Sequence, residues 1–342
     1  MGNKATPPRS FNTIRRSQAK VRAQRRRNQG IVLLAAVATV ALILLALLVL
    51  GGFAIANAII KATPPAQSQT PITPSATTNE IQFIQTTKSA DAIHSGTLIL
   101  VNNQNEYRFP IGVSLPLISE NAVKKANGGR IYSPVPGVEK LEEKTLQALN
   151  AMMYKYYELD EDANFAISSA YRTEKDQQNL VDAERTDIQP GYSEHHTGYC
   201  VAIQFYDSNN NRKNIKFESH SWFYDNAHKY GFVIRYPEGK KDITGVSDYE
   251  HCFRYVGVPH ATYMYQNNLC LEEYLDLLKD SYSSAATRLT ISAADGFDYD
   301  VYYVAASGSD VTTIDVPTSN FEYTVSGDNR SGFIVTVKKP AA

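Results

Sequence analysis

The feature that most constrains this 342-residue chain is a stretch without any charged residue, residues 31–60, which opens with an almost purely aliphatic run. A helix of about 20 apolar residues, rising about 1.5 Å per residue, spans a hydrocarbon core about 30 Å thick. The alternative is a cleaved signal peptide, with small residues at Ala54, Ala56 and Ala58. The apolar region of a signal peptide is only about 7–15 residues long, however. We therefore expect an uncleaved transmembrane anchor at residues 31–60.

Charge is distributed unevenly around this segment. The chain has 34 lysines and arginines against 35 aspartates and glutamates, but nine of the basic residues and no acidic residue lie within residues 1–30. The remaining 25 basic and 35 acidic residues sum to −10. The positive-inside rule predicts a cytoplasmic basic tail at residues 1–30, with the later residues outside the cell. A body with excess negative charge also argues against a nucleic-acid partner, since phosphate binding needs a basic face.

Composition divides the outer part into a linker and two folded regions. Residues 61–80 are rich in Thr, Ser and Pro and lack an apolar period, which indicates an extended spacer. Residues 81–284 mix short helices and strands without a regular βαβ alternation, which favours an α+β domain. The expected helices are 141–157, 174–183, 221–230 and 271–278, and the expected strands are 97–101, 164–169, 199–205, 232–236 and 253–256.

The last region, residues 285–342, has a different texture. Its short alternating runs are rich in Thr, Val and Tyr and are separated by turn residues, which predicts a small all-β module. Nothing in this module is typical of a catalytic set, so a binding or spacer role is the hypothesis for it. The expected strands are 288–291, 299–304, 312–316, 321–325 and 332–337.

The motifs that carry chemistry lie between residues 168 and 257. They include Ser-Ala-Tyr-Arg at 169–172, Gly-Tyr-Ser-Glu-His-His-Thr-Gly at 191–198 and Phe-Arg-Tyr-Val-Gly at 253–257. In this order and spacing they resemble the VanY-type D-alanyl-D-alanine carboxypeptidases of bacterial cell walls, over roughly residues 88–282. The resemblance implies a Hedgehog/D,D-peptidase-like mixed domain and a zinc peptidase whose three ligands leave one position open for water.

At three of the four metal and base positions, the sequence departs from this family. His195 matches the first zinc ligand, but the aspartate ligand is replaced by Ala202, which cannot ligate a metal. The third ligand falls on Cys252, and the general base falls on Tyr249. The neighbouring pair Glu250 and His251 is a poor substitute, because a displacement of one residue turns a strand side chain to the opposite face.

Two of the three cysteines are expected to lie where the family holds its metal. The resemblance brings Cys252 close to position 202, and Cys200 lies one pleat away on the same strand face. Three interpretations stay open. Cys200 and Cys252 form a disulfide, with Cys270 as the free thiol, or His195, Cys200 and Cys252 bind zinc as an N/S site. In the third, the replacements are unconnected and followed a loss of activity.

The resemblance also supplies substrate residues. Arg172 is implied to contact both the substrate and the developing oxyanion, and Tyr249 keeps the position of the catalytic base. Gln177 and Ser193 match positions that help to seat a terminal D-alanine. The planar fork of an arginine suits a carboxylate, because it gives two charge-assisted hydrogen bonds. The competing interpretation of Arg172 is a structural ion pair.

Three functions follow from these features. The favoured one is a membrane-anchored extracellular pseudopeptidase that binds peptidoglycan stem peptides ending in D-Ala and needs no cofactor. The first alternative is an active D,D-carboxypeptidase that uses zinc at an unorthodox His/Cys site, so enzymatic activity stays uncertain. The second is a structural protein of the cell envelope. In each case we expect a bacterial cell-membrane protein with one span, and the sequence does not indicate an oligomeric state.

Overall fold

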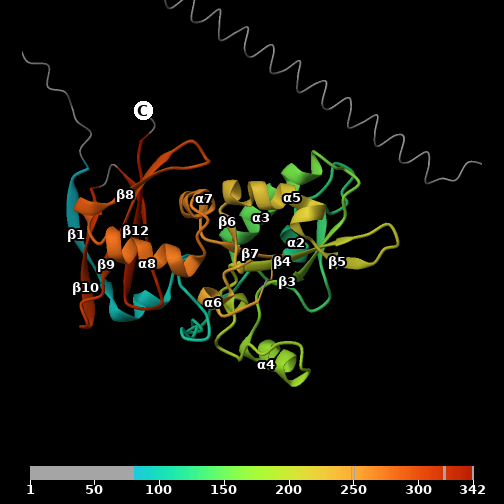
Figure 1. The fold of residues 1–342 in the computed structure, drawn as a ribbon, viewed down its shortest axis with the longest axis horizontal. Helices are drawn as coiled ribbons and strands as arrows, with labels where there is room; N and C mark the ends of the chain where they lie inside the picture. The colour runs from blue at the N-terminus through green and yellow to red at the C-terminus, as the bar shows by residue number, and fades with distance from the viewer. Residues whose placement is uncertain (1–80, 248, 250, 319–320, 341–342) are drawn as a thin grey trace, which may run out of the picture. The chain divides into compact units, whose positions relative to one another are not determined.

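The computed structural model describes residues 81–340 except 248, 250, 319 and 320 (Figure 1). The basic tail, the transmembrane anchor and the linker expected at residues 1–80 lie outside these described residues. Within the described part of the chain, no helix combines the length and the apolar character that a membrane crossing requires.

The centre of the domain is a six-stranded mixed sheet in the order β2-β3-β4-β7-β6, with β5 paired to β4. Strands β2 and β3 are parallel, and the other pairs are antiparallel. The motif segments therefore meet in neighbouring strands of one sheet. These strands are β2 (Tyr132–Pro134), β3 (Phe165–Ser169), β4 (Cys200–Tyr206), β5 (Arg212–Asn214), β6 (Phe232–Ile234) and β7 (Cys252–Tyr255).

One face of this sheet packs against helices α3 (Glu143–Tyr157) and α5 (Phe217–Asn226). Glu142 caps α3, because its side chain accepts a hydrogen bond from the Thr145 amide at 2.9 Å. Leu146, Leu149, Met152 and Met153 recur at helical spacing on the buried side of α3. They pack with sheet residues Phe165, Ile167, Val201, Ile203 and Phe253.

A second sheet, in the order β11-β12-β9-β8, packs against helices α7 (Val258–Gln266) and α8 (Leu271–Ser281). Alternate residues of its strands enter two cores. Tyr303 and Ile334 face the helices, whereas Tyr302 and Phe333 face the pair of strands β1 and β10. The strands are β1 (Phe83–Ser89), β8 (Leu289–Ser292), β9 (Asp298–Ala305), β10 (Val311–Pro317), β11 (Glu322–Gly327) and β12 (Gly332–Lys338).

The strands expected in residues 285–342 are therefore present, but they do not form a self-contained module. Strand β1 comes from the start of the described chain and pairs with β10 along its whole length (Figure 1). The helix-facing core is shared, because it includes Val233 of β6 and Tyr274 of α8 beside Val301 of β9. A boundary at residue 284 would cut through this apolar core.

The strand expected at residues 97–101 was a wrong prediction. This segment is buried, but its backbone groups bond to side chains and loops instead of a neighbouring strand. Arg254 donates to the carbonyl oxygens of Thr97 and Ile99 at 2.9 and 3.0 Å, and Asn329 donates to that of Leu100 at 2.8 Å. An apolar run specifies burial, and here side-chain donors satisfy the backbone without a ladder.

The remaining elements are short, and most of them connect strands of the first sheet. The expected helix at 174–183 is α4 (Glu174–Asp182), which begins with a capping box between Thr173 and Asp176. The expected helix at 221–230 is α5 followed by a 3-10 turn that ends at Gly231. The others are η1 (Ala90–His94), α2 (Ile118–Asn121), η2 (Glu194–Thr197), η3 (Ala227–Tyr230), α6 (Lys241–Thr244) and η4 (Ala285–Thr287).

The shared core predicts that both sheets unfold together. Ile334→Ala removes a fully buried side chain of β12 and is expected to lower the free energy of unfolding by about 2–4 kcal/mol. Trp222, the one tryptophan of the sequence, packs against the core of the first sheet and reports its unfolding by fluorescence. Its urea midpoint should fall in Ile334→Ala but not in the control Val311→Ala, whose side chain is half exposed. An unchanged Trp222 transition in Ile334→Ala would show that the sheets are independent.

Candidate functional site

The candidate site lies on the face of the first sheet opposite α3. In β4, Val201 and Ile203 point into the core under α3, so the alternation of strand side chains turns Cys200 and Ala202 to the other face. Strand β7 runs antiparallel beside β4 and places Cys252 directly opposite Ala202. The two motifs that the sequence analysis singled out are thus adjacent in space.

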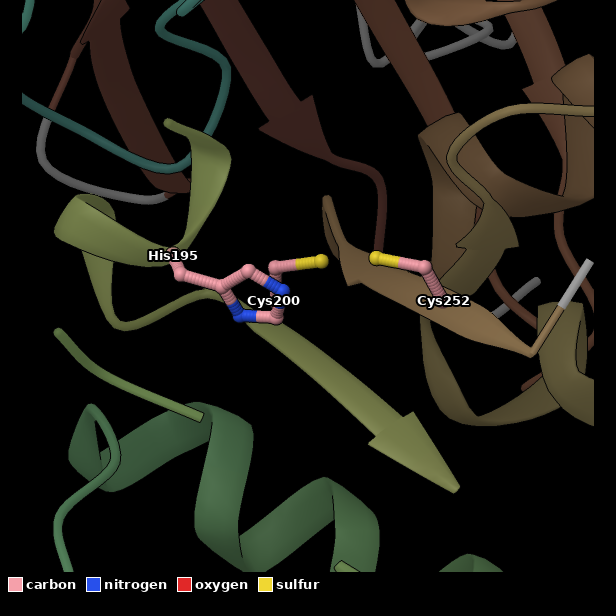
Figure 2. Close-up of side chains that lie close together, drawn as sticks. All are labelled: His195, Cys200 and Cys252. Carbon is pink, nitrogen blue, oxygen red and sulfur yellow. The ribbon is translucent and has the colours of Figure 1, made fainter. Parts of the chain in front are cut away.

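His195 joins this face from η2, the 3-10 turn immediately before β4. Ser193 caps the turn, because its hydroxyl accepts from the His195 amide at 3.4 Å, and Gly198 ends the turn with a φ of +73°. The ligand atoms of His195, Cys200 and Cys252 all lie within 4.8 Å of one another, and all three residues are buried (Figure 2). The structure therefore brings together the three residues expected for an N/S metal site.

The electrostatic environment keeps His195 neutral. Burial lowers the pKa of its imidazole well below the ordinary value, and the positive charge of Arg172 lowers it further. The Nδ1 atom is buried without a hydrogen-bond partner among the described residues. A neutral imidazole with an unpartnered nitrogen is the form that can ligate a metal.

The expected disulfide between Cys200 and Cys252 is absent, since all three cysteines are free thiols. The register explains the difference. Cys200 lies opposite Arg254 and Cys252 opposite Ala202, so the cysteines are diagonal neighbours. Diagonal residues have Cα atoms roughly 7–8 Å apart, whereas a disulfide needs about 4.4–6.8 Å. Burial raises the pKa of the Cys200 thiol well above its ordinary value, and a hydrogen bond links it to Cys252.

The residues at the expected aspartate and base positions do not supply the groups of a hydrolytic zinc centre. Ala202 is buried at the aspartate position and offers no donor atom. The Tyr249 side chain is 46% exposed, and its ring packs beside His251 with centroids 4.2 Å apart. Burial lowers the pKa of His251 to about 4, and Glu250 lies outside the described residues. No hydrolytic step can therefore be assigned to the described side chains.

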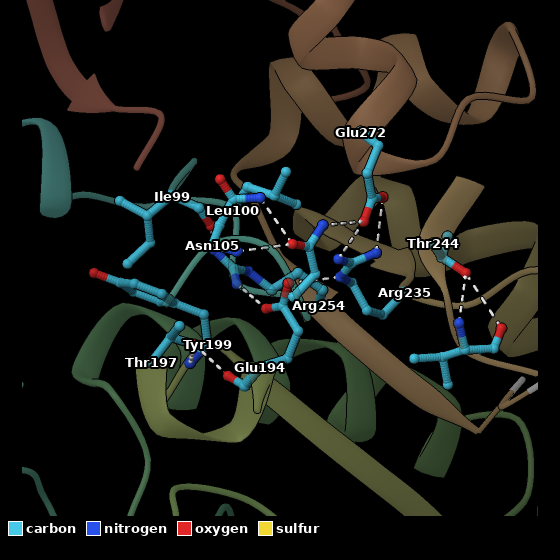
Figure 3. Close-up of polar contacts among 12 residues, drawn as sticks. Ile99, Leu100, Asn105, Glu194, Thr197, Tyr199, Arg235, Thr244, Arg254 and Glu272 are labelled. Atoms are coloured by element: carbon cyan, nitrogen blue, oxygen red, sulfur yellow. Dashed lines mark hydrogen bonds and ion pairs between the residues drawn. The ribbon is translucent and has the colours of Figure 1, made fainter. Parts of the chain in front are cut away.

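A buried ion network that the sequence analysis did not predict holds η2 in place (Figure 3). Glu194 is 1% exposed. Its carboxylate accepts from Arg235 at 2.6 Å and from the Arg254 guanidinium. Arg235 also donates to Glu272 of α8 at 3.0 and 2.7 Å. The available signal was the presence of Glu194 and Arg254 within the motifs at residues 191–198 and 253–257.

Arg172 is fixed beside the metal positions. Its guanidinium donates to Gln177 at 3.0 Å and to the Ser169 hydroxyl, and Gln177 in turn donates to the Ile188 carbonyl at 2.7 Å. His196 accepts from the Gly191 amide through Nε2, so its Nδ1 carries the proton and donates to the Arg172 carbonyl at 2.8 Å. Arg172 thus has a defined orientation.

A cavity of about 540 Å³ opens next to Arg172. Its lining includes three cations, Arg172, Arg185 and Arg212, and one acid, Asp176. Gln177 and Ser193 are buried and serve as supports, Gln177 for the Arg172 guanidinium and Ser193 for the turn that carries His195. An anionic ligand group suits this lining because the cations outnumber the acid.

Comparison with known proteins first identifies the class of protein to which this fold belongs. The fold is the mixed α/β fold of D,D-peptidases. It is similar to the vancomycin-resistance D,D-dipeptidase VanXYg, solved with a D-Ala-D-Ala phosphinate analogue, with a TM-score of 0.61. The sequence identity is 26%, and the match covers 75% of this chain and 100% of that chain. The family model VanY, D-alanyl-D-alanine carboxypeptidase, matches residues 138–258.

Curated relatives define the family more closely. A D-alanyl-D-alanine carboxypeptidase of Enterococcus faecium is 30% identical over 262 residues, which cover 73% of this chain and 78% of that protein. The putative carboxypeptidase YodJ of Bacillus subtilis (strain 168) is 44% identical over 93 residues, which cover 26% of this chain and 34% of that protein. The chain belongs to the VanY family of D-alanyl-D-alanine carboxypeptidases, as its motifs predicted.

The buried network predicts a large stability loss when Glu194 loses its charge. Glu194→Gln leaves Arg254 with only carbonyl partners, and breaking a buried ion pair costs about 3–5 kcal/mol. The matched control is Glu273→Gln, whose partner Lys240 and own side chain are partly exposed, and which should change stability by less than about 1 kcal/mol. Urea unfolding measures both. A loss below 1 kcal/mol for Glu194→Gln would contradict the assignment of the network.

The same network predicts how the stability of the fold changes with pH. Burial acts to raise the pKa of Glu272, but the charge and hydrogen bonds of Arg235 outweigh it, so the pKa lies below the ordinary value. A depressed pKa means that this carboxylate stabilises the fold above its unfolded pKa, about 4.3. This contribution should be lost as the pH falls through the lower, folded pKa.

Proposed function

We propose that this protein is a membrane-anchored, extracellular member of the VanY family that binds peptidoglycan stem peptides ending in D-Ala and hydrolyses them poorly or not at all. One observation carries the proposal. Arg172 keeps a fixed orientation beside a cavity of peptide size, whereas the position of the aspartate ligand is occupied by the buried methyl group of Ala202.

Peptide binding is supported by the charges around the cavity. A stem peptide ends in a carboxylate, and the guanidinium of Arg172 can donate two parallel hydrogen bonds to it. Arg185 and Arg212 line the same cavity and add positive charge. Because Gln177 and Ser169 already hold Arg172, little side-chain entropy is lost when the peptide binds.

Loss of hydrolysis is supported by the missing groups. Tyr249 stands in the place of the general base, and the carboxylate of Glu194, next to His195 in the chain, is held by two arginines. Removing a general base alone lowers rates by about 10²–10⁴-fold. The loss of an oxygen ligand at Ala202 removes part of the metal's support as well.

The membrane location in this proposal comes from the sequence. The charge-free residues 31–60 follow a basic tail, so the folded domain is proposed to lie outside the cell on a spacer of residues 61–80. External protease added to intact cells should degrade the domain. Protection of the domain, or a mature N-terminus near residue 58, would exclude this topology.

The second candidate is an active carboxypeptidase with zinc on His195, Cys200 and Cys252, and it is favoured by the convergence of those donor atoms within 4.8 Å. The two candidates differ in turnover. Release of D-Ala that chelators abolish would favour the second candidate.

We expect the full chain to bind a D-Ala-D-Ala-terminated peptide while releasing D-Ala at least about a thousandfold more slowly than an active relative. Arg172→Ala should weaken binding about 10–100-fold, since a hydrogen bond to a charged group contributes about 1.5–3 kcal/mol. Arg172→Lys should recover only part of the affinity, because it keeps the charge and loses the fork. Calorimetry and a D-Ala release assay measure the two quantities.

The control for this experiment is Arg108→Ala, which removes an arginine whose side chain is 63% exposed and whose partner is Asp91. It should leave peptide affinity unchanged. Equal affinity of the wild type and Arg172→Ala would refute the peptide-binding proposal, and rapid turnover by the wild type would refute the loss of hydrolysis.

A further inference from the structure

We infer that His195, Cys200 and Cys252 form a thiolate-rich metal site that holds one soft d¹⁰ cation, next to Ala202, which offers no donor atom. The three residues supply one nitrogen and two sulfur donors within 4.8 Å of one another. This inference does not depend on peptide binding, so the two can fail separately.

Cys200 lies two residues before Ala202 on the same strand, so a donor at this position is displaced by one pleat from position 202. Residues 200 and 202 share the same face of β4, so a donor at position 200 can serve the space that a donor at 202 would serve. Cys252 contributes from the adjacent strand and His195 from η2 (Figure 2). Metal bonds of about 2.3 Å to sulfur and 2.0–2.1 Å to nitrogen place donors roughly 3.5–4 Å apart. Metal binding would therefore require the donor atoms to move together by about 1 Å.

The surroundings of the site match a closed metal centre. His195, Cys200 and Cys252 are 6%, 0% and 1% exposed, and the His195 Nδ1 atom has no hydrogen-bond partner among the described residues. Tyr236 and Val246 pack against the two cysteines and shield the sulfurs. A buried polar atom without a partner is costly, and a metal bond would satisfy it.

The donor set selects the class of cation. Two sulfurs and one imidazole suit zinc(II) or copper(I), whereas magnesium, calcium and manganese require oxygen ligands, which these three residues lack. Binding displaces two thiol protons to solvent, so zinc(II) with two thiolates and a neutral imidazole carries no net charge in the buried site. Copper(I) would leave one negative charge, next to the guanidinium of Arg172.

The test loads the reduced full-length chain with cobalt(II) as a spectroscopic substitute for zinc, and in parallel with zinc(II) and copper(I). We expect one equivalent of cobalt, with thiolate-to-cobalt charge-transfer absorption in the near ultraviolet. Cys200→Ser and Cys252→Ser should each weaken cobalt binding more than about a hundredfold. Cys270→Ser is the matched control, because Cys270 is equally buried but caps α8, and it should bind normally.

X-ray absorption at the zinc edge of the loaded wild type tests the site without any variant, and two sulfurs with one imidazole nitrogen are expected. The parallel titrations with zinc(II) and copper(I) identify the preferred cation. Binding of either ion through both thiolates supports the proposed site. The inference is overturned if Cys200→Ser binds cobalt like the wild type, if three reduced thiols take up no metal, or if peptide mapping finds Cys200 bonded to Cys252. Peptide affinity measured on the same samples reports the proposed function independently.

Discussion

The buried carboxylate of Glu194 is the group on which the arrangement of the domain depends. The carboxylate lies between Arg235, which directly follows β6, and Arg254 of β7. In the chain, Glu194 directly precedes His195. Arg235 extends the network to Glu272 of α8, and Arg254 extends it to the carbonyl groups of Thr97 and Ile99. One set of charges thus fixes the turn that carries His195 and joins the first sheet to the helices under the second. Buried ions of this kind stabilise only as a complete set, which makes the network intolerant of a single change.

The site therefore combines a preserved support with altered chemistry. Hydrogen bonds orient Arg172 and His196, and Ser193 caps the turn that carries His195. Positions 202, 249 and 252, in contrast, hold Ala, Tyr and Cys. Binding needs only the oriented arginine and the cavity, but hydrolysis also needs a base and an activated water. We propose that this separation lets a member of a carboxypeptidase family bind a peptide while hydrolysing it poorly or not at all.

Much of the fold could be predicted from the sequence, because α3, β3, β4 and α8 have clear periodicity and end signals. The convergence of His195, Cys200 and Cys252 followed from the family resemblance together with strand alternation. Strand register could not be read in this way, so the diagonal placement of Cys200 and Cys252, free thiols in this structure, was not predicted. The burial of Glu194, the irregular segment at residues 97–101 and the shared core of both sheets also escaped prediction, since each depends on contacts between distant residues.

We propose that three positions, and not the scaffold, separate this chain from a hydrolytic enzyme. The direct measurement is D-Ala release by the triple variant Ala202→Asp, Cys252→His and Tyr249→Glu, assayed with zinc beside the wild type. We expect chelator-sensitive release by the triple variant and none by the wild type under the same conditions. Comparable release by the wild type, or an inactive triple variant that folds and binds zinc, would contradict it.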